Sequence, residues 1–155
     1  MIMKLKLLIA ILLVTVVMLV ACQTTPVPPS TTEQGVEFTL APGEAAIVTG
    51  AGLTIKLVSI LNDSRCPRDV ECTESGPVQI SLSVQKDNGT AADLALQAFT
   101  DMDGRSPAME FEGITDRILY EGYLIRIVGV LPYPENLSTS IKDDEYLVSF
   151  VVTEK

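Results

Sequence analysis

Apolar and polar residues alternate with a period of two along most of the chain after residue 36. The alternation is clearest at 78–84, where Val, Ile and Leu alternate with Gln and Ser, and at 146–152, where Tyr, Val and Phe hold every second position. This pattern is typical of β-strands with one buried face and one wet face. Two further runs, 53–60 and 123–131, are predicted as strands on the same grounds. Shorter candidates span residues 36–40, 45–48, 94–99 and 117–120.

Turn-forming residues separate these runs, at 41–43, 50–52, 87–89 and 103–104. The pair Asn88-Gly89 predicts a tight hairpin, because both residue types tolerate a positive φ. No window of 12 or more residues shows an apolar stripe at helical spacing. The sequence therefore predicts an all-β fold. We expect an antiparallel β-sandwich of about seven or eight strands with an immunoglobulin-like layout, and a small closed β-barrel is the alternative.

The N-terminus has a different pattern from the rest of the chain. Lys4 and Lys6 precede an apolar run that begins at Leu7 and ends in Leu19-Val20-Ala21-Cys22. A basic, then apolar, then small-residue order is typical of a secretory signal. The last four residues resemble a bacterial lipobox, which implies cleavage before Cys22 and attachment of a lipid such as palmitate to its thiol. An uncleaved membrane helix is the alternative, but the run is shorter than the roughly 20 apolar residues that a spanning helix needs.

The sequence is therefore predicted to consist of three segments: a signal peptide at 1–21, a lipidated cysteine with a Pro/Thr-rich linker at 22–35, and a single domain at 36–155.

Removal of the signal peptide takes away two lysines and no acidic residue. The exported chain then holds 9 Lys and Arg against 20 Asp and Glu, a net charge of −11. An acidic surface repels nucleic acid and anionic headgroups, so neither is an expected partner. Histidine, the commonest general base and metal ligand, is absent.

Cys66 and Cys72 are the other two cysteines. In an oxidising compartment a pair this close is most simply a disulfide. The alternative is an exported thiol-redox protein that uses the same pair, although the spacing differs from the Cys-x-x-Cys of disulfide exchangers. Two thiols alone do not make a metal site, and no further ligands are apparent.

The segment around these cysteines also resembles a known family. Asp63-Ser64-Arg65-Cys66-Pro67, followed by Val70 and Cys72, is similar to a motif of small uncharacterised lipoproteins and secreted proteins from bacteria and archaea. Gly122-Tyr123, Leu131-Pro132-Tyr133-Pro134 and the Tyr-led run 146–152 match the C-terminal half of that family. The resemblance implies a β-rich fold and no known activity. The family has Trp-Ala-Gly after the second cysteine, where this chain has Thr73-Glu74-Ser75-Gly76.

A calcium loop is the other candidate for chemistry. Asp101, Asp103 and Glu112 occupy the first, third and twelfth positions of an EF-hand loop, but Arg105 stands at the fifth, so a polar turn is the preferred interpretation. Arg65 and Arg68, close to Asp63, are expected to form local ion pairs. Serine nucleophiles have no histidine partner. The sequence thus predicts no catalytic residue and no cofactor.

These observations predict an extracytoplasmic lipoprotein of a prokaryote, anchored through Cys22 in the cell membrane or the outer membrane. Its domain is expected to be non-enzymatic, and to bind an unknown protein or envelope partner or to support the envelope. A peptidase-inhibitor-like module and a thiol-redox protein are the alternative functions.

Overall fold

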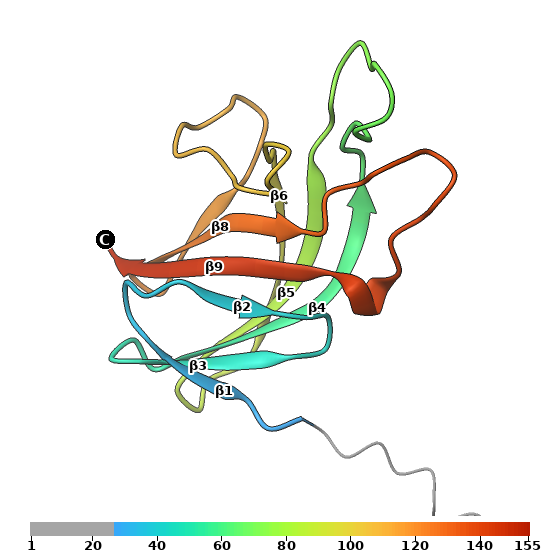
Figure 1. Cartoon of the computed structure of the whole chain (residues 1–155). Coiled ribbons are helices and arrows are strands. Elements are labelled where there is room, and N and C mark those ends of the chain that lie inside the picture. Colours follow the sequence, from blue (N-terminus) through green and yellow to red (C-terminus); the bar gives the residue numbers. More distant parts are fainter. Residues whose placement is uncertain (1–26) are drawn as a thin grey trace, which may run out of the picture.

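The computed structural model describes residues 27–155, so the predicted signal peptide and Cys22 lie outside the described residues. Two sheets pack face to face, and neither closes into a barrel (Figure 1). The five-stranded sheet has the order β1-β3-β4-β5-β6, and the four-stranded sheet has the order β2-β9-β8-β7. The strands are β1 (Ser30–Glu33), β2 (Phe38–Leu40), β3 (Ala45–Thr49), β4 (Leu53–Asp63), β5 (Val78–Lys86), β6 (Ala92–Ala98), β7 (Arg117–Tyr120), β8 (Tyr123–Leu131) and β9 (Leu147–Glu154).

The prediction of an all-β sandwich is confirmed, and the barrel alternative is wrong. Each of the eight segments predicted from alternation contains a strand. Residues 87–91 join β5 to β6 as an antiparallel hairpin, but this connection is longer than the tight turn predicted at Asn88-Gly89, and the residue with a positive φ is Asp87. The general two-sheet layout of immunoglobulin domains is present, but most neighbouring strands are also consecutive in the chain, so the connections are largely meanders. One short 3₁₀ turn, η1 (Asp143–Glu145), precedes β9.

The first strand departs from the predicted domain boundary. β1 lies inside the segment 22–35 that was expected to be linker, and it pairs with β3 in parallel, whereas the other pairs are antiparallel. Its side chains are mostly exposed. Backbone hydrogen bonding along the edge of β3 therefore holds β1 in place, which side-chain periodicity cannot reveal. The ordered domain begins earlier than position 36 for this reason.

The core lies between the two inner faces. In β5 the residues Val78, Ile80, Leu82 and Val84 are fully buried, and half-buried Gln and Ser alternate with them. Phe150 is the largest fully buried side chain on the opposite sheet. Full burial of such a side chain stabilises the fold by about 1.5–3 kcal/mol. The side chains that point into the core therefore produce the alternation of apolar and polar residues that is seen in the sequence.

Three long connections lie at the same end of the sandwich, at the top of Figure 1. They join β4 to β5 (residues 64–77), β6 to β7 (99–116) and β8 to β9 (132–146). We call these three connections the loop end. All of the chemistry-bearing candidates of the described chain lie in or next to them.

Candidate functional site

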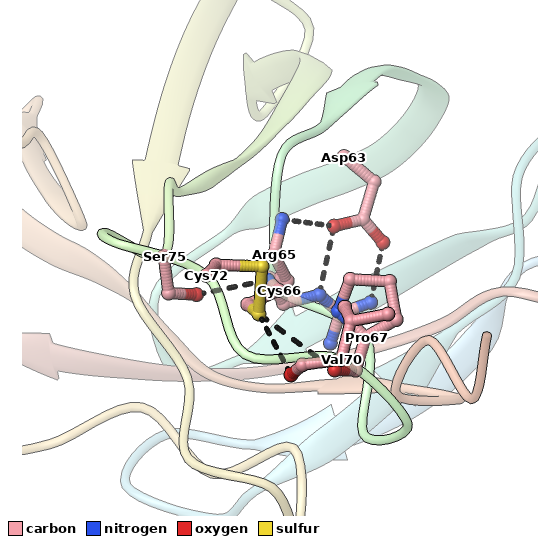
Figure 2. Close-up of a disulfide and its surroundings, with 7 residues drawn as sticks. All are labelled: Asp63, Arg65, Cys66, Pro67, Val70, Cys72 and Ser75. Atoms are coloured by element: carbon pink, nitrogen blue, oxygen red, sulfur yellow. Dashed lines mark hydrogen bonds and ion pairs between the residues drawn. A yellow bond between two sulfur atoms is a disulfide. The ribbon is translucent and has the colours of Figure 1, made fainter. Parts of the chain in front are cut away.

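Arg65 is the centre of the loop end. Arg65 is only 4% exposed. All five N–H groups of its guanidinium donate hydrogen bonds to acceptors within the protein. Nε and Nη2 donate to the Asp63 carboxylate at 2.9 and 2.6 Å (Figure 2). Nη1 donates to the carbonyl of Val130 at 2.8 Å and to the hydroxyl of Thr100 at 3.3 Å. Nη2 also donates to the carbonyl of Pro132 at 2.8 Å.

This one side chain therefore joins all three connections of the loop end. The predicted local ion pair between Arg65 and Asp63 is confirmed, and the side chains of the pair are 0% and 10% exposed. With every donor occupied, the guanidinium has no N–H group left for an external anion. Arg65 is a structural residue in this geometry.

Tyr146, which directly precedes β9, is the third member of the Arg65–Asp63 cluster. Its hydroxyl donates to Oδ2 of Asp63 at 3.0 Å, so the carboxylate accepts from both an arginine and a tyrosine. Burial raises the pKa of Tyr146 well above its usual range, and the negative charge of Asp63 adds to the rise. The phenol is consequently a hydrogen-bond donor at neutral pH and not a base.

The Cys66–Cys72 disulfide is present, as the sequence predicts, with the Cα atoms 6.0 Å apart. The backbone N–H of Cys66 donates to the hydroxyl of Ser75 at 3.0 Å, which ties the two sides of the loop together (Figure 2). Sγ of Cys66 lies 3.7 and 3.6 Å from the carbonyl oxygens of Pro67 and Val70. Those oxygens carry partial negative charge, so they would disfavour a thiolate if the bond were reduced.

Tyr133 joins the disulfide loop to the β8–β9 connection. The guanidinium groups of Arg65 and Arg68 lie over its buried ring, 5.1 and 5.4 Å from the centroid. The backbone N–H of Arg68 donates to the carbonyl of Pro134 at 3.1 Å, and its side chain pairs with Glu135 at 3.1 Å and with the carbonyl of Met102. The ion pair of Arg68 thus reaches across to another loop, and not to the acids next to it in the sequence.

A cavity of about 400 Å³ opens between the disulfide loop and the β8–β9 connection, and we call it the disulfide groove. Its apolar wall consists of the disulfide, Pro67, Pro134, Leu137 and Ile141. A second cavity of about 270 Å³ lies along the same connection and shares Ile141 with the groove. Asn136, Thr139 and Ser140 also line both cavities. The groove is the largest of the cavities described.

A second arginine cluster holds the 99–116 connection. Asp116 is 6% exposed and accepts from Arg117 at 2.8 Å and from Arg126 at 3.4 Å. Arg126 also donates to the carbonyl of Pro107 at 2.6 Å. A smaller cavity of about 320 Å³ in this connection includes Phe111 in its lining. Arg117 on β7 and Arg126 on β8, both half-buried, thus hold the 99–116 connection against the four-stranded sheet through Asp116.

The residues considered as calcium ligands, Asp101, Asp103 and Glu112, form a local turn or lie exposed. Oδ1 of Asp101 accepts from the backbone N–H groups of Asp103 and Arg105 at 3.0 and 2.8 Å, which is an Asx-type turn. Arg105 pairs with Glu37, and its hydrogen bonds hold the pKa of that carboxyl below the usual value. Glu112 is exposed. Within residues 27–155, no three His, Cys, Asp or Glu side chains gather closely enough to hold a metal ion.

The motifs that carry the family resemblance come together in space. Asp63 and Arg65 from the first motif contact Pro132 and Tyr133 from the second and Tyr146 from the third. The motifs are recognisable in the sequence, but the sequence does not show that they contact one another. Thr100 and the carbonyl of Val130, which also accept hydrogen bonds from Arg65, lie outside the motifs and were not predicted.

Comparison with known proteins finds no match for this chain among family models, curated proteins or solved structures. In the described part of the chain, no helix is long and apolar enough to span a membrane. The disulfide is the kind of bond that persists in oxidising compartments outside the cytoplasm.

Proposed function

We propose that this protein is a cell-envelope lipoprotein whose β-sandwich acts as a binding or structural module and not as an enzyme. One observation carries the proposal: the groups best suited to chemistry at the loop end are engaged in holding the fold. The Arg65 guanidinium, the Asp63 carboxylate and the Tyr146 phenol bind one another or the backbone, and the two thiols form a disulfide.

The pattern of burial supports the same proposal. Every buried side-chain nitrogen and oxygen in residues 27–155 has a hydrogen-bond partner. Active sites commonly keep polar groups whose partners arrive with the substrate, whereas a scaffold satisfies them internally. The exposed ends of the loops remain available for contacts with a partner.

Anchoring at Cys22 is the part of the proposal that the lipobox supports. Substitution Cys22→Ser is expected to prevent lipid attachment and release the protein from membranes, or to stall its processing. Metabolic labelling with a fatty acid analogue and membrane fractionation test this directly. Cys66→Ser is a control that keeps Cys22 and should still be labelled. A wild-type chain that carries no label contradicts the anchor.

The absence of catalysis needs its own test. The purified exported chain is screened against hydrolase substrates and thiol–disulfide exchange substrates, and no turnover is expected. The redox alternative predicts instead that reagents titrate two reactive thiols in the native protein, because exchange chemistry requires an accessible thiolate. Turnover that a single change such as Asp101→Asn abolishes would overturn the proposal, since a general acid or base contributes about 10²–10⁴-fold.

A further inference from the structure

We propose that the disulfide groove is the docking site for an aliphatic side chain carried by a positively charged polypeptide partner. This inference rests on the proposed binding function and names its site and the chemistry of its partner. It follows from three properties of the loop end: the shape of the groove, the bonds that join the two connections forming it, and the distribution of charge around it.

The groove has the size and surface of a small binding site. Its volume of about 400 Å³ falls in the range of about 300–1,000 Å³ that is usual for ligand pockets. The disulfide and Pro67 line it from the β4–β5 connection, and Pro134, Leu137 and Ile141 line it from the β8–β9 connection. Leu137 is 77% exposed, the highest value among the large apolar residues described. Cover by an apolar partner group would remove this side chain from water.

The two connections that form the groove are joined to each other before any partner arrives. The disulfide closes one wall, the Arg65 cluster holds its base, and backbone hydrogen bonds from Arg68 to Pro134 and from Asp69 to Glu135 join the two walls at 3.1 Å each. A preorganised site loses little conformational freedom on binding, so the contacts that it makes contribute more fully to affinity.

The charge around the groove selects the partner. The three connections of the loop end contain 12 Asp and Glu and 4 Lys and Arg, a net charge of −8. The rest of the exported chain, residues 22–155 without these connections, has 8 acids and 5 bases, a net charge of −3. Most of the net negative charge of the exported chain therefore lies in the connections of the loop end, two of which form the groove. Such a field attracts a basic polypeptide and repels a second copy of this chain and an anionic lipid surface.

The groove also lies away from the start of the domain. In Figure 1 the first described residues, which lead into β1, leave the sandwich at the bottom, and the loop end stands at the top. An anchor that precedes residue 27 would therefore leave the loop end accessible. A partner can reach the groove without displacing the strand that follows the anchor.

The test uses the full lipidated chain in nanodiscs of phosphatidylcholine, which carry no net charge. The probe is a dye-labelled peptide, Lys-Lys-Leu-Lys-Lys, whose affinity is measured by fluorescence anisotropy. Two matched peptides replace the central leucine by serine or the four lysines by glutamate. Hydrogen–deuterium exchange locates the site, with protection expected at residues 66–72 and 134–141. Raising the salt from about 0.05 M to about 0.5 M should weaken binding.

Two protein variants separate the groove from the rest of the surface. Leu137→Ser should reduce the affinity for the lysine–leucine peptide about tenfold, the loss expected when one aliphatic contact is removed. Val58→Ser changes another exposed aliphatic residue, on β4, and should leave the affinity unchanged. Because both side chains are exposed, neither change is expected to unfold the domain.

Several results would overturn the inference. They are no binding of the lysine–leucine peptide, equal binding of either matched peptide, protection outside the groove, or equal effects of the two variants. Dimers in sedimentation equilibrium that Leu137→Ser abolishes would assign the groove to a second copy instead. A protein without turnover that fails to bind the peptide refutes the groove alone, whereas a protein with turnover refutes the proposed function.

Discussion

Removal of the Arg65 guanidinium should be among the most damaging single changes at the loop end. The substitution Arg65→Met keeps an unbranched side chain of similar length and deletes the charge and all five donors. It leaves the carboxylate of Asp63 buried beside Tyr146, and it leaves the carbonyls of Val130 and Pro132 without their donor. We expect the free energy of unfolding to fall by about 3–5 kcal/mol, the usual cost of breaking a buried ion pair from one side.

The chain supplies a matched control. Arg105 also makes a bidentate pair with a carboxylate, that of Glu37, but the two side chains are 53% and 43% exposed. Solvent screens this pair, so Arg105→Met should cost at most about 1 kcal/mol. Both substitutions remove a guanidinium that forms a bidentate pair. Arg65 differs from Arg105 in being buried and in donating three further hydrogen bonds, to Thr100, Val130 and Pro132.

Equilibrium unfolding in urea, followed by circular dichroism, measures both costs. Urea is uncharged and does not screen the ion pairs, and its linear extrapolation gives the free energy of unfolding in water. The double change Asp63→Leu with Arg65→Met should recover part of the loss, because it removes the uncompensated charge. Equal costs for Arg65→Met and Arg105→Met, or a cost below about 1 kcal/mol for Arg65→Met, would refute the reasoning.

Three further predictions concern single features of the domain. Gly104→Ala should lower the free energy of unfolding by about 2–4 kcal/mol, because Gly104 has a φ of +76° and an added Cβ would come within 2.6 Å of a backbone oxygen. Gly113→Ala, with a φ of +79° and open space around it, should cost only about 1–2 kcal/mol in the same urea assay, and equal costs would contradict the packing argument. Reduction of the Cys66–Cys72 bond should cost about 2 kcal/mol on the chain-entropy model. Mass spectrometry should show the unreduced protein lighter than the reduced one by two hydrogen atoms, and free thiols in the native protein would contradict the bond. Tyr146 ionises less readily in the folded chain than in the unfolded chain, so stability should fall as the pH rises beyond about 10, more steeply in the wild type than in Tyr146→Phe; parallel pH profiles would contradict this role.

The strands were predictable because their signal is local. A sandwich strand places every second side chain in the core, so the alternation at 78–84 or 146–152 records its burial directly. The disulfide was predictable from two cysteines close in the sequence, given the expectation of export. The predicted polar turn at Asp101–Gly104 is also present, because an Asx turn depends on neighbours in the chain.

The first strand and the role of Arg105 were not predictable in this way. β1 buries little side-chain surface, and the bonds that hold it join backbone groups to β3, so a Pro/Thr-rich composition gave no sign of pairing. In the sequence, Arg105 stands out only because it occupies a ligand position of the calcium-loop pattern. Its partner, Glu37, lies 68 residues away, and nothing in the local sequence points to it.

The sequence by itself determined the class of fold, the strands other than β1 and the cysteine pair, because each depends on residue type at short spacing. Only the tertiary structure decided what Arg65 does. Its acceptors at Thr100 and Val130 lie 35 and 65 residues away, and Tyr146 reaches Asp63 across 83 residues. Hydrogen bonds are short and directional, so which polar groups meet depends on how the two sheets pack and on where their connections end.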